Sequence, residues 1–291
     1  MLKEAVQGLK INSDGIYVDV TFGGGGHSRE ILSHLSPDGK LFAFDQDQSA
    51  FANKLEDHRF QLIKGNFADI KRHLKFYGIT SVDGILADFG VSSHQFDSGE
   101  RGFSTRYEGL LDMRMNHSGQ LDASQVVNEY SLENLRMVLG QYGELRNTHK
   151  LAAAIVKERK EAPIKTTQSL VALLTPIIPK HIFNKIIAQV FQAIRIEVND
   201  ELGVIKSFLK QTIDILKQNG RLVCISYHSL EDRLVKYFIR EGKFEGIAES
   251  DLYGNKYLPF KKIGGLIIPS EKEIKFNSRS RSGKLRIAVR I

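Results

Sequence analysis

The chain is 291 residues long, and its composition of 42% hydrophobic, 26% charged and 9% aromatic residues excludes disordered, collagen-like and disulfide-rich proteins. Its 41 Lys and Arg residues exceed its 34 Asp and Glu residues, and the net charge of +7 either attracts a polyanionic partner or only keeps the chain in solution. A single cysteine, Cys224, excludes an internal disulfide and favours the reducing cytoplasm. No apolar run is long enough to span a membrane, and the first residues do not resemble a signal peptide.

Short apolar runs alternate with helical patterns through the first part of the chain. The runs that predict strands are residues 16–20, 41–44, 60–64 and 82–88. The patterns between them that predict helices are residues 27–35 and 67–77. Because strands that alternate with helices form parallel sheets, the sequence predicts an α/β fold with a doubly wound sheet.

The pattern changes beyond Gly90. Residues 91–119 are rich in Ser, Gly, Asp and Arg, and so long a segment without periodicity is typical of a functional loop. Residues 122–199 have helical patterns throughout, with Ser131 as a helix cap. The helices expected within this stretch are residues 148–160, 167–174 and 183–198.

The sheet pattern then returns. One helix and two further strands are expected at residues 200–218, 221–226 and 285–291. The domains that follow from this pattern are a discontinuous sheet domain, residues 1–115 and 200–291, and an inserted all-helical domain, residues 116–199.

Four consecutive glycines, Gly23 to Gly26, join the first expected strand to the first helix. Glycines leave the backbone bare, so a ligand can lie against main-chain amides at the start of the helix. At the end of the next strand, Asp45 occupies the position where an acidic side chain holds the hydroxyl groups of a ribose. The combination indicates a cofactor that contains adenosine, and a tight turn beside a surface acid is the alternative.

Two polar residues beside this loop distinguish a nicotinamide dinucleotide from S-adenosylmethionine. A dinucleotide site favours Gly or Ala where this chain has Ser28, because the helix must pack closely there. Asp19 would repel a pyrophosphate but attract the amino group of a methionine. Both residues therefore favour S-adenosylmethionine. Phe67, after the third strand, either flanks the adenine or belongs to the core.

Asp88 ends the fourth strand, and the carboxyl ends of parallel strands face the crevice where ligands bind. We therefore expect Asp88 to be the leading site residue. His228 follows the next strand and either moves a proton in the crevice or, with Ser229, caps the following helix. The nine histidines are not spaced as paired metal ligands with carboxylates, so no metal site is expected.

Several motifs occur in order over nearly the whole chain. They are Thr-Phe-Gly-Gly-Gly-Gly-His-Ser at 21–28, Asp-Phe-Gly-Val-Ser-Ser-His-Gln at 88–95, Glu-Arg-Gly-Phe-Ser at 100–104, Leu-Asp-Met-Arg-Met at 111–115, Phe-Gln-Ala-Ile-Arg-Ile-Glu-Val-Asn-Asp-Glu at 191–201, Tyr-His-Ser-Leu-Glu-Asp-Arg at 227–233 and Asn-Ser-Arg-Ser-Arg-Ser-Gly-Lys-Leu-Arg at 277–286. Together they resemble the ribosomal RNA small subunit methyltransferase H (MraW) family. Members of that family usually have a His and a short apolar stretch before the segment that matches residues 2–6. We therefore expect this chain to begin within the family's N-terminal segment.

The resemblance implies methylation of the exocyclic N(4) amine of cytidine 1402 in bacterial 16S ribosomal RNA, with S-adenosylmethionine as the cofactor. It also implies a class I, Rossmann-like methyltransferase fold that carries an inserted helical domain. The cofactor contacts that it implies are Gly25, Gly26, His27, Asp45, Phe67, Asp88 and Gln95. Asp88 then either orients the amine as a catalytic residue or only binds the cofactor, and His228 is the second candidate for catalysis.

The segment from Lys275 to Ile291 holds six basic residues and no acidic one. Such a segment suits phosphate contacts, although a run of charge is also typical of a solvated surface. The side chains expected to contact 16S RNA, alone or within the small ribosomal subunit, are Arg114, Arg279, Arg281 and Lys284. Those expected to stack on an extruded cytosine are Phe103, Tyr107 or Met113. Whether the helical domain meets RNA or a second copy of the chain, in a homodimer, stays open.

Two other functions stay open as well. A nicotinamide-dependent oxidoreductase is disfavoured by Ser28 and by the lack of an evident acid or base for hydride transfer. A non-catalytic RNA-binding or assembly factor with a relic cofactor pocket would keep the same glycine loop. Transfer of a labelled methyl group to RNA distinguishes both from a methyltransferase.

Overall fold

The computed structural model describes residues 1–91, 99–116, 119–254 and 256–291. These residues form two compact units, Met1–Gly90 with Leu202–Ile291 and Val91–Glu201. Residues 91 and 99–115 therefore group with the helical unit, whereas we expected them in the sheet domain. The reason is burial, because Phe103, Leu111 and Met113 pack into the core that the helices of that unit form.

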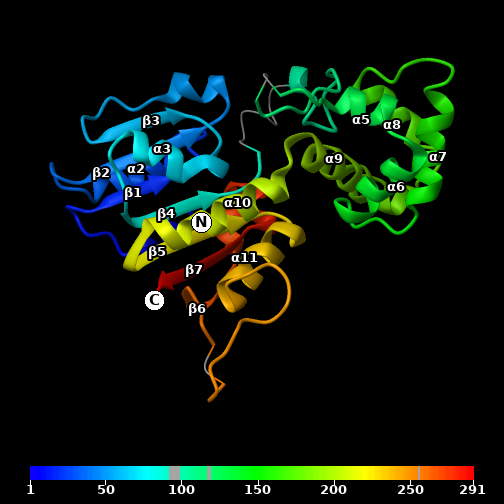
Figure 1. Cartoon of the computed structure of the whole chain (residues 1–291). Helices are drawn as coiled ribbons and strands as arrows, with labels where there is room; N and C mark the ends of the chain where they lie inside the picture. Colours follow the sequence, from blue (N-terminus) through cyan, green and yellow to red (C-terminus); the bar gives the residue numbers. More distant parts are fainter. Residues whose placement is uncertain (92–98, 117–118, 255) are drawn as a thin grey trace. The chain divides into compact units, whose positions relative to one another are not determined.

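The first unit is built on a sheet of described residues that contains seven strands in the order β3-β2-β1-β4-β5-β7-β6 (Figure 1). The strands are β1 (Ile16–Asp19), β2 (Lys40–Asp45), β3 (Phe60–Lys64), β4 (Val82–Asp88), β5 (Leu216–Ser226), β6 (Phe260–Ile267) and β7 (Lys284–Arg290). β3, β2, β1, β4 and β5 pair in parallel, whereas β7 is antiparallel to both β5 and β6. This arrangement confirms the doubly wound α/β fold and agrees with the class I methyltransferase fold that the resemblance implies.

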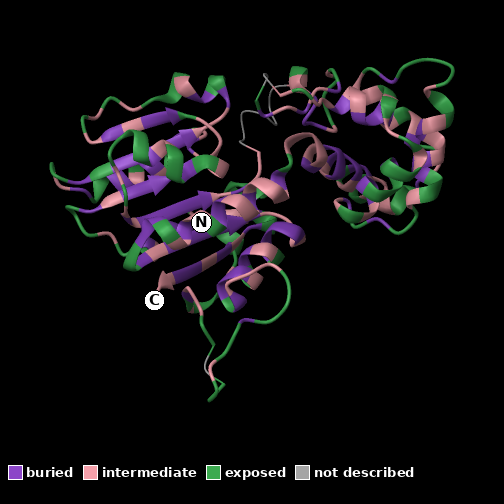
Figure 2. Ribbon diagram, in the orientation of Figure 1, coloured by how far each residue is buried: buried purple, intermediate pink, exposed green. Residues whose placement is uncertain are grey.

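Helices pack on both faces of this sheet. The helices of the unit are α1 (Leu2–Leu9), α2 (Gly26–Ser33), α3 (Ile70–Phe76), α10 (Glu201–Ile215), α11 (Ser229–Glu241) and α12 (Glu271–Phe276). Leu74 of α3, Phe208 of α10 and Phe238 of α11 share one buried core. Val6 of α1 and Ile31 of α2 belong to the other. Figure 2 shows the strands between these cores as mostly buried, which explains why they read as continuous apolar runs in the sequence.

The structure departs from the predicted elements mainly in the last third of the chain. The helix expected over residues 200–218 ends at Ile215, because Leu216 already pairs with Val82 as the first residue of β5. Asn219 has a φ of 67°, so the chain turns sharply there before the strand continues. Three elements, α1, β6 and α12, were not predicted from the sequence. In β6 most side chains are exposed and Gly264 is left-handed, so no apolar alternation marks the strand.

The second unit consists mainly of helices. They are α5 (Ala123–Glu129), α6 (Leu132–Gln141), α7 (Thr148–Glu158), α8 (Thr167–Leu174) and α9 (Phe183–Asn199). Asp122 and Gln125 cap the start of α5 reciprocally, and Ser131 caps α6 as expected. The apolar faces meet in one core that includes Ile155 and Phe191. No helix in the described part of the chain is long and apolar enough to cross a membrane.

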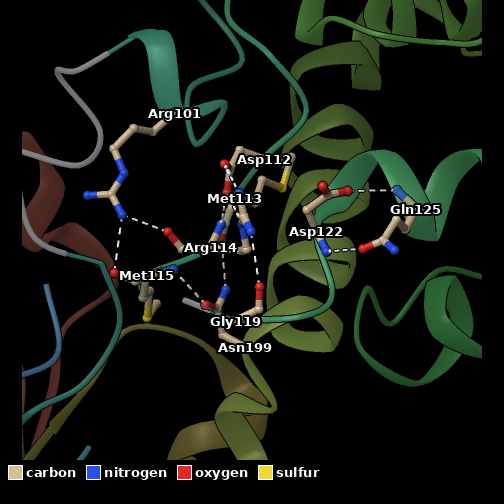
Figure 3. Close-up of polar contacts among 9 residues, drawn as sticks. All are labelled: Arg101, Asp112, Met113, Arg114, Met115, Gly119, Asp122, Gln125 and Asn199. Atoms are coloured by element: carbon tan, nitrogen blue, oxygen red, sulfur yellow. Dashed lines mark hydrogen bonds and ion pairs between the residues drawn. The ribbon is translucent and has the colours of Figure 1, made fainter. Parts of the chain in front are cut away.

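A polar network ties the loop before α5 to the end of α9 (Figure 3). Asn199 Nδ2 donates to the carbonyl of Met113 at 2.8 Å, and Asn199 Oδ1 accepts the N–H of Met115 at 2.8 Å. Arg101 Nη2 donates to the carbonyl of Arg114 at 2.6 Å. These bonds flank Met113, whose φ of 56° is unfavourable for a residue other than glycine. The network therefore holds the loop in a conformation that it would not adopt alone.

Candidate active site

The glycine loop connects β1 to α2 at the carboxyl edge of the sheet. Gly25 is the N-cap residue of α2 and has a φ of 72°, a left-handed conformation that favours glycine. A Cβ added at Gly25 would lie 2.9 Å from Phe22 Cε2, so a side chain does not fit there. A Cβ added at Gly24 or Gly26 would meet no described atom within 4 Å. The backbone at these two positions therefore has the open space that a ligand needs to approach the start of a helix.

Asp45, at the end of β2, holds the glycine loop in place. Its Oδ2 accepts the N–H of Gly23 at 2.8 Å, and its Oδ1 accepts the N–H of Asp47 at 2.8 Å. Burial raises the pKa of the Asp45 carboxyl to about 6, although these two N–H groups lower it. Each carboxylate oxygen can accept a further hydrogen bond, so the side chain can also bind the hydroxyls of a ribose.

Asp19 has a structural role that the sequence does not reveal. Its carboxylate is fully buried and accepts the Ser28 hydroxyl at 2.7 Å and the N–H of Thr21 at 3.1 Å. Burial raises the pKa of this carboxyl, and the bond from Ser28 offsets part of the effect. Asp19 therefore joins the end of β1 to the start of α2, and the expectation that it attracts a methionine amino group finds no support in its position.

Phe67 lies three residues after the end of β3 and is half-buried. Its ring packs edge-on against Phe208, with ring centres 5.4 Å apart, and tilted against Phe89 at 6.1 Å. The residue is therefore part of the edge of the core, and the remaining exposed surface of its ring is available to flank an adenine. Its role as a cofactor contact stays a prediction.

Asp88 is the last residue of β4. Its N–H donates to Thr21 Oγ1 at 2.7 Å, and its Oδ2 lies 3.6 Å from His27 Nδ1. The other oxygen, Oδ1, is buried without a hydrogen-bond partner among the described residues. Burial raises the pKa of this carboxyl, whereas His27 and the Tyr227 hydroxyl lower it. A buried acceptor without a partner costs free energy unless a ligand supplies a donor, so Oδ1 fits an amino group bound at this edge.

Glu231 of α11 shapes the turn that follows β5. Its side chain is fully buried, and its Oε2 accepts the N–H of Tyr227 at 2.8 Å and that of His228 at 3.3 Å. His228 is the N-cap residue of α11, and its Nε2 lies 3.1 Å from Glu231 Oε1. His228 therefore lies at the start of α11, as expected if it caps that helix. Its catalytic role stays a prediction.

The sheet brings the expected site residues to one edge. Asp88 pairs with Ile225 across β4 and β5, so Asp88 and Tyr227 emerge from neighbouring strand ends. The expected residues that follow or end the strands of this edge are Gly25, Gly26, His27, Asp45, Phe67, Asp88 and His228. Gln95 lies outside the described residues. Tyr227 and Glu231 were not identified as site residues from the sequence, and their place in the motif at 227–233 was the available signal.

The whole sequence, residues 1–291, matches the MraW methylase family. The chain belongs to this family. It is 60% identical to a ribosomal RNA small subunit methyltransferase H of Christiangramia forsetii over 291 residues, which are 100% of this chain and 96% of the relative. A protein of the same name from Cytophaga hutchinsonii is 54% identical over 292 aligned positions, which cover 100% of this chain and 98% of that protein.

Two solved structures resemble this MraW methylase more distantly. A putative rRNA-methylase from Clostridium thermocellum has a TM-score of 0.46 and 12% identity, over 100% of this chain and 97% of that one. An rRNA methylase from Streptococcus thermophilus has a TM-score of 0.43 and 11% identity, over 100% of this chain and 93% of that one. The family assignment rests on the sequence match and not on these likenesses.

Membership of a methylase family confirms S-adenosylmethionine as the cofactor and excludes the oxidoreductase alternative. The residues of the site fit this molecule in two respects. The backbone at Gly26 is open, and the Asp45 carboxylate can accept ribose hydroxyls.

Within the helical unit of this methylase, Arg114 is engaged in internal contacts (Figure 3). Its Nε and Nη2 donate to the carboxylate of Asp112 at 2.9 Å and 2.8 Å. Its Nη1 donates to the carbonyl of Gly119 at 3.0 Å. The guanidinium therefore links Asp112 to Gly119 within the loop. The RNA contact expected of Arg114 stays a prediction, and these internal bonds are an alternative role for the side chain.

The three side chains expected to stack on a cytosine differ in their exposure. Phe103 is 4% exposed and Met113 is 1% exposed, so both belong to the core of the helical unit. The expectation that either stacks on a base is therefore wrong. Tyr107 is 55% exposed, and its ring remains accessible to a ligand.

The basic segment expected to contact RNA precedes and begins β7. Arg279 and Arg281 are exposed in a short 3-10 helix, Ser278–Ser282. Lys284 is half-buried, and its Nζ lies 3.5 Å from Asp232 Oδ2. Because Lys284 pairs with Ser226 at the carboxyl end of β5, this segment runs along the same edge of the sheet as Asp88. Its contact with RNA stays a prediction.

Proposed function

We propose that this methylase transfers a methyl group to the exocyclic N(4) amine of cytidine 1402 in 16S ribosomal RNA. The observation that carries the proposal is the buried Oδ1 of Asp88, which has no hydrogen-bond partner among the described residues and lies at the edge that also holds the glycine loop. The shared name of the relatives supports small subunit ribosomal RNA as the substrate. The family resemblance supports the cytidine and the atom that is methylated.

The chain's own residues divide the binding of the cofactor between them. Gly25 and Gly26 would hold it against the start of α2, Asp45 would accept the ribose hydroxyls, and Phe67 would flank the adenine. Gln95 would complete this set, although it lies outside the described residues. S-adenosylmethionine supplies a methyl group on a positively charged sulfur, which makes that methyl electrophilic without a metal.

Cytosine N(4) is a weak nucleophile because its lone pair is conjugated into the ring. An oxygen that accepts hydrogen bonds from the amine draws the lone pair toward the methyl group and fixes its direction. Asp88 can do this, because its carboxylate lies at the strand end and one oxygen has no donor among the described residues. As the new N–C bond forms and the bond between the methyl carbon and the sulfur breaks, the sulfur leaves as a neutral thioether and the amine must lose a proton. Burial raises the pKa of the Asp88 carboxyl, which makes its carboxylate a better proton acceptor than that of a solvated Asp.

Three of the expected RNA contacts lie along the same edge of the sheet, and the fourth, Arg114, belongs to the helical unit. Arg279, Arg281 and Lys284 would bind phosphates beside the reacting base, and Arg114 would contact RNA only through the part of its guanidinium that its internal bonds leave exposed. A cytoplasmic location agrees with this substrate. A homodimer and the absence of a metal remain predictions from the sequence.

One experiment tests the proposal against its remaining alternative. The purified chain is incubated with S-adenosylmethionine labelled in the methyl group and with small subunit RNA, either naked or within the assembled subunit. Mass spectrometry then locates the labelled nucleoside. Label on N(4) of the cytidine supports the proposal, label on another nucleoside contradicts the proposed target, and RNA binding without any label supports a non-catalytic assembly factor.

A further inference from the structure

Phe276 is the last residue of α12, and its side chain is 95% exposed. No aromatic ring in the described part of the chain packs on it. A phenylalanine so exposed gains nothing from folding, since its ring stays in water. We infer that Phe276 is a stacking platform for an unpaired RNA base next to the methylated nucleotide, and this inference rests on the proposed function.

The position of α12 relative to the site supports this role. The short 3-10 helix Ser278–Ser282 follows α12 directly and leads into β7. At the start of β7, Lys284 pairs with Ser226 at the carboxyl end of β5. A Cβ added at Gly283 would lie 3.8 Å from Tyr227 Cε1. The segment that carries Phe276 therefore borders the edge where Asp88 and Tyr227 lie, and a strand of RNA bound there would pass it.

The positive charges on the C-terminal side of α12 favour RNA as the molecule that stacks on Phe276. The acidic side chains of α12, Glu271 and Glu273, lie in its first turn, whereas Lys275 lies in its last turn. Beyond Phe276, the exposed Arg281 follows within a segment that has no acidic residue. An exposed ring with cations beside it matches how proteins bind single-stranded nucleic acid, in which bases stack on aromatic rings and cations contact the phosphates.

Hydrogen bonds hold the turn that follows α12. The side chain of Asn277 accepts the N–H of Arg279 at 3.1 Å, and the hydroxyl of Ser280 donates to the carbonyl of Asn277 at 2.7 Å. Ser280 is buried beneath this turn. These contacts fix the backbone on the C-terminal side of Phe276, so less entropy is lost when a base stacks on it.

The chain supplies a matched control for Phe276. Phe76 is also preceded by a lysine, also ends a short helix, and is 84% exposed. α3 starts after the carboxyl end of β3, so it runs back toward the opposite edge of the sheet, and Phe76 lies away from the site. Phe76→Ala therefore removes a ring that is also largely exposed, although it contacts the ring of Tyr77, from a position away from the site.

The test measures binding of a fluorescein-labelled single-stranded RNA of about ten nucleotides centred on the target cytidine, in a series of salt concentrations. Phe276→Ala should weaken binding about fivefold or more and leave the salt dependence unchanged, because a neutral ring contacts no phosphate. Phe276→Trp should restore the affinity and Phe276→Leu should not, because stacking needs a ring. Phe76→Ala should bind as the wild type does. Ultraviolet irradiation should crosslink the RNA to the peptide that contains Phe276.

The outcomes that overturn the inference differ from those that overturn the proposed function. Wild-type affinity in Phe276→Ala, or full rescue by leucine, contradicts stacking even if the wild type methylates its cytidine. A changed oligomeric state in Phe276→Ala with unchanged RNA affinity assigns the ring to a second copy of the chain instead. If the wild type itself neither binds nor methylates the RNA, it is the proposed function that fails.

Discussion

Nδ1 of His27, in the first turn of α2, lies 3.6 Å from Oδ2 of Asp88, the last residue of β4. The contact joins the glycine loop to the residue that we propose to act on the amine. Burial raises the pKa of Asp88, whereas His27 lowers it and so favours the carboxylate form. The cofactor side of the site therefore helps to keep Asp88 able to accept a proton.

We expect Asp88→Asn to lower the rate of methyl transfer by more than tenfold while the protein stays folded. The amide keeps an oxygen that can accept a hydrogen bond from the amine, but it cannot take up a proton at neutral pH. Single-turnover methylation of the RNA measures the effect, and calorimetric titration with S-adenosylmethionine measures cofactor binding. A normal rate contradicts the role of proton acceptor, and a lowered rate that follows entirely from weaker cofactor binding assigns Asp88 to the cofactor alone.

Tyr227→Phe should move the acidic limb of the pH–rate profile to higher pH by about one unit. The Tyr227 hydroxyl lowers the pKa of Asp88, so its removal raises that pKa further. Asp88 is then protonated, and unable to accept a proton, at a higher pH than in the wild type. A hydrogen bond to a charged group contributes roughly 1.5–3 kcal/mol, and one pKa unit corresponds to about 1.36 kcal/mol. Methyl transfer measured across a pH series checks the shift, and an unchanged profile means that Tyr227 does not act on Asp88.

The affinity for S-adenosylmethionine should fall as the pH decreases through about 6, because the pKa of the Asp45 carboxyl is raised to about 6 in the folded protein. The ribose hydroxyls donate to the ionised carboxylate, so protonation below this pH removes an acceptor. Asp45→Asn should bind the cofactor more weakly than the wild type and lose this pH dependence. Titration calorimetry on both sides of pH 6 measures both proteins. A wild-type affinity that is constant across this range contradicts the contact.

Much of the sheet unit was predictable because its signals are local. β1, β3 and β4 are short apolar runs, and each ends where the sequence places a polar or glycine-rich segment. Parallel strands bring such ends to one edge, so Asp45 and Asp88 could be assigned to a common site. The role of Asp19 was not predictable, since only the structure shows that Ser28 turns its hydroxyl toward that carboxylate.

The loop before α5 shows where sequence reasoning fails. Its composition indicated a functional loop in which Phe103 or Met113 stacks on a base and Arg114 contacts RNA, yet Phe103 and Met113 are buried and Arg114 bonds to Asp112. The partner that fixes Met113 is Asn199, which lies far along the chain at the end of α9. No periodicity reveals a contact between residues so distant in sequence. Phe276 was overlooked for the opposite reason, because exposure cannot be inferred from a single apolar residue in a basic segment.

Arg114→Gln should lower the stability of the protein, whereas Arg281→Gln should leave it almost unchanged. The Arg114 guanidinium donates to Asp112 and Gly119 and is 25% exposed, so its loss should destabilise the helical unit by about 1–2 kcal/mol. Arg281 is exposed beside the site, so Arg281→Gln should leave stability within about 0.5 kcal/mol of the wild type.

The same two variants should also separate structural from phosphate contacts in RNA binding. Loss of one phosphate contact with a single strand lowers the slope of log affinity against log salt by about 0.7, and we expect this change for Arg281→Gln only. Urea unfolding and RNA titrations over a salt series measure both quantities on both proteins. A reduced slope in Arg114→Gln would show that this side chain reaches RNA in spite of its internal bonds. An unchanged slope in Arg281→Gln would remove the basic segment before β7 from the RNA-binding surface.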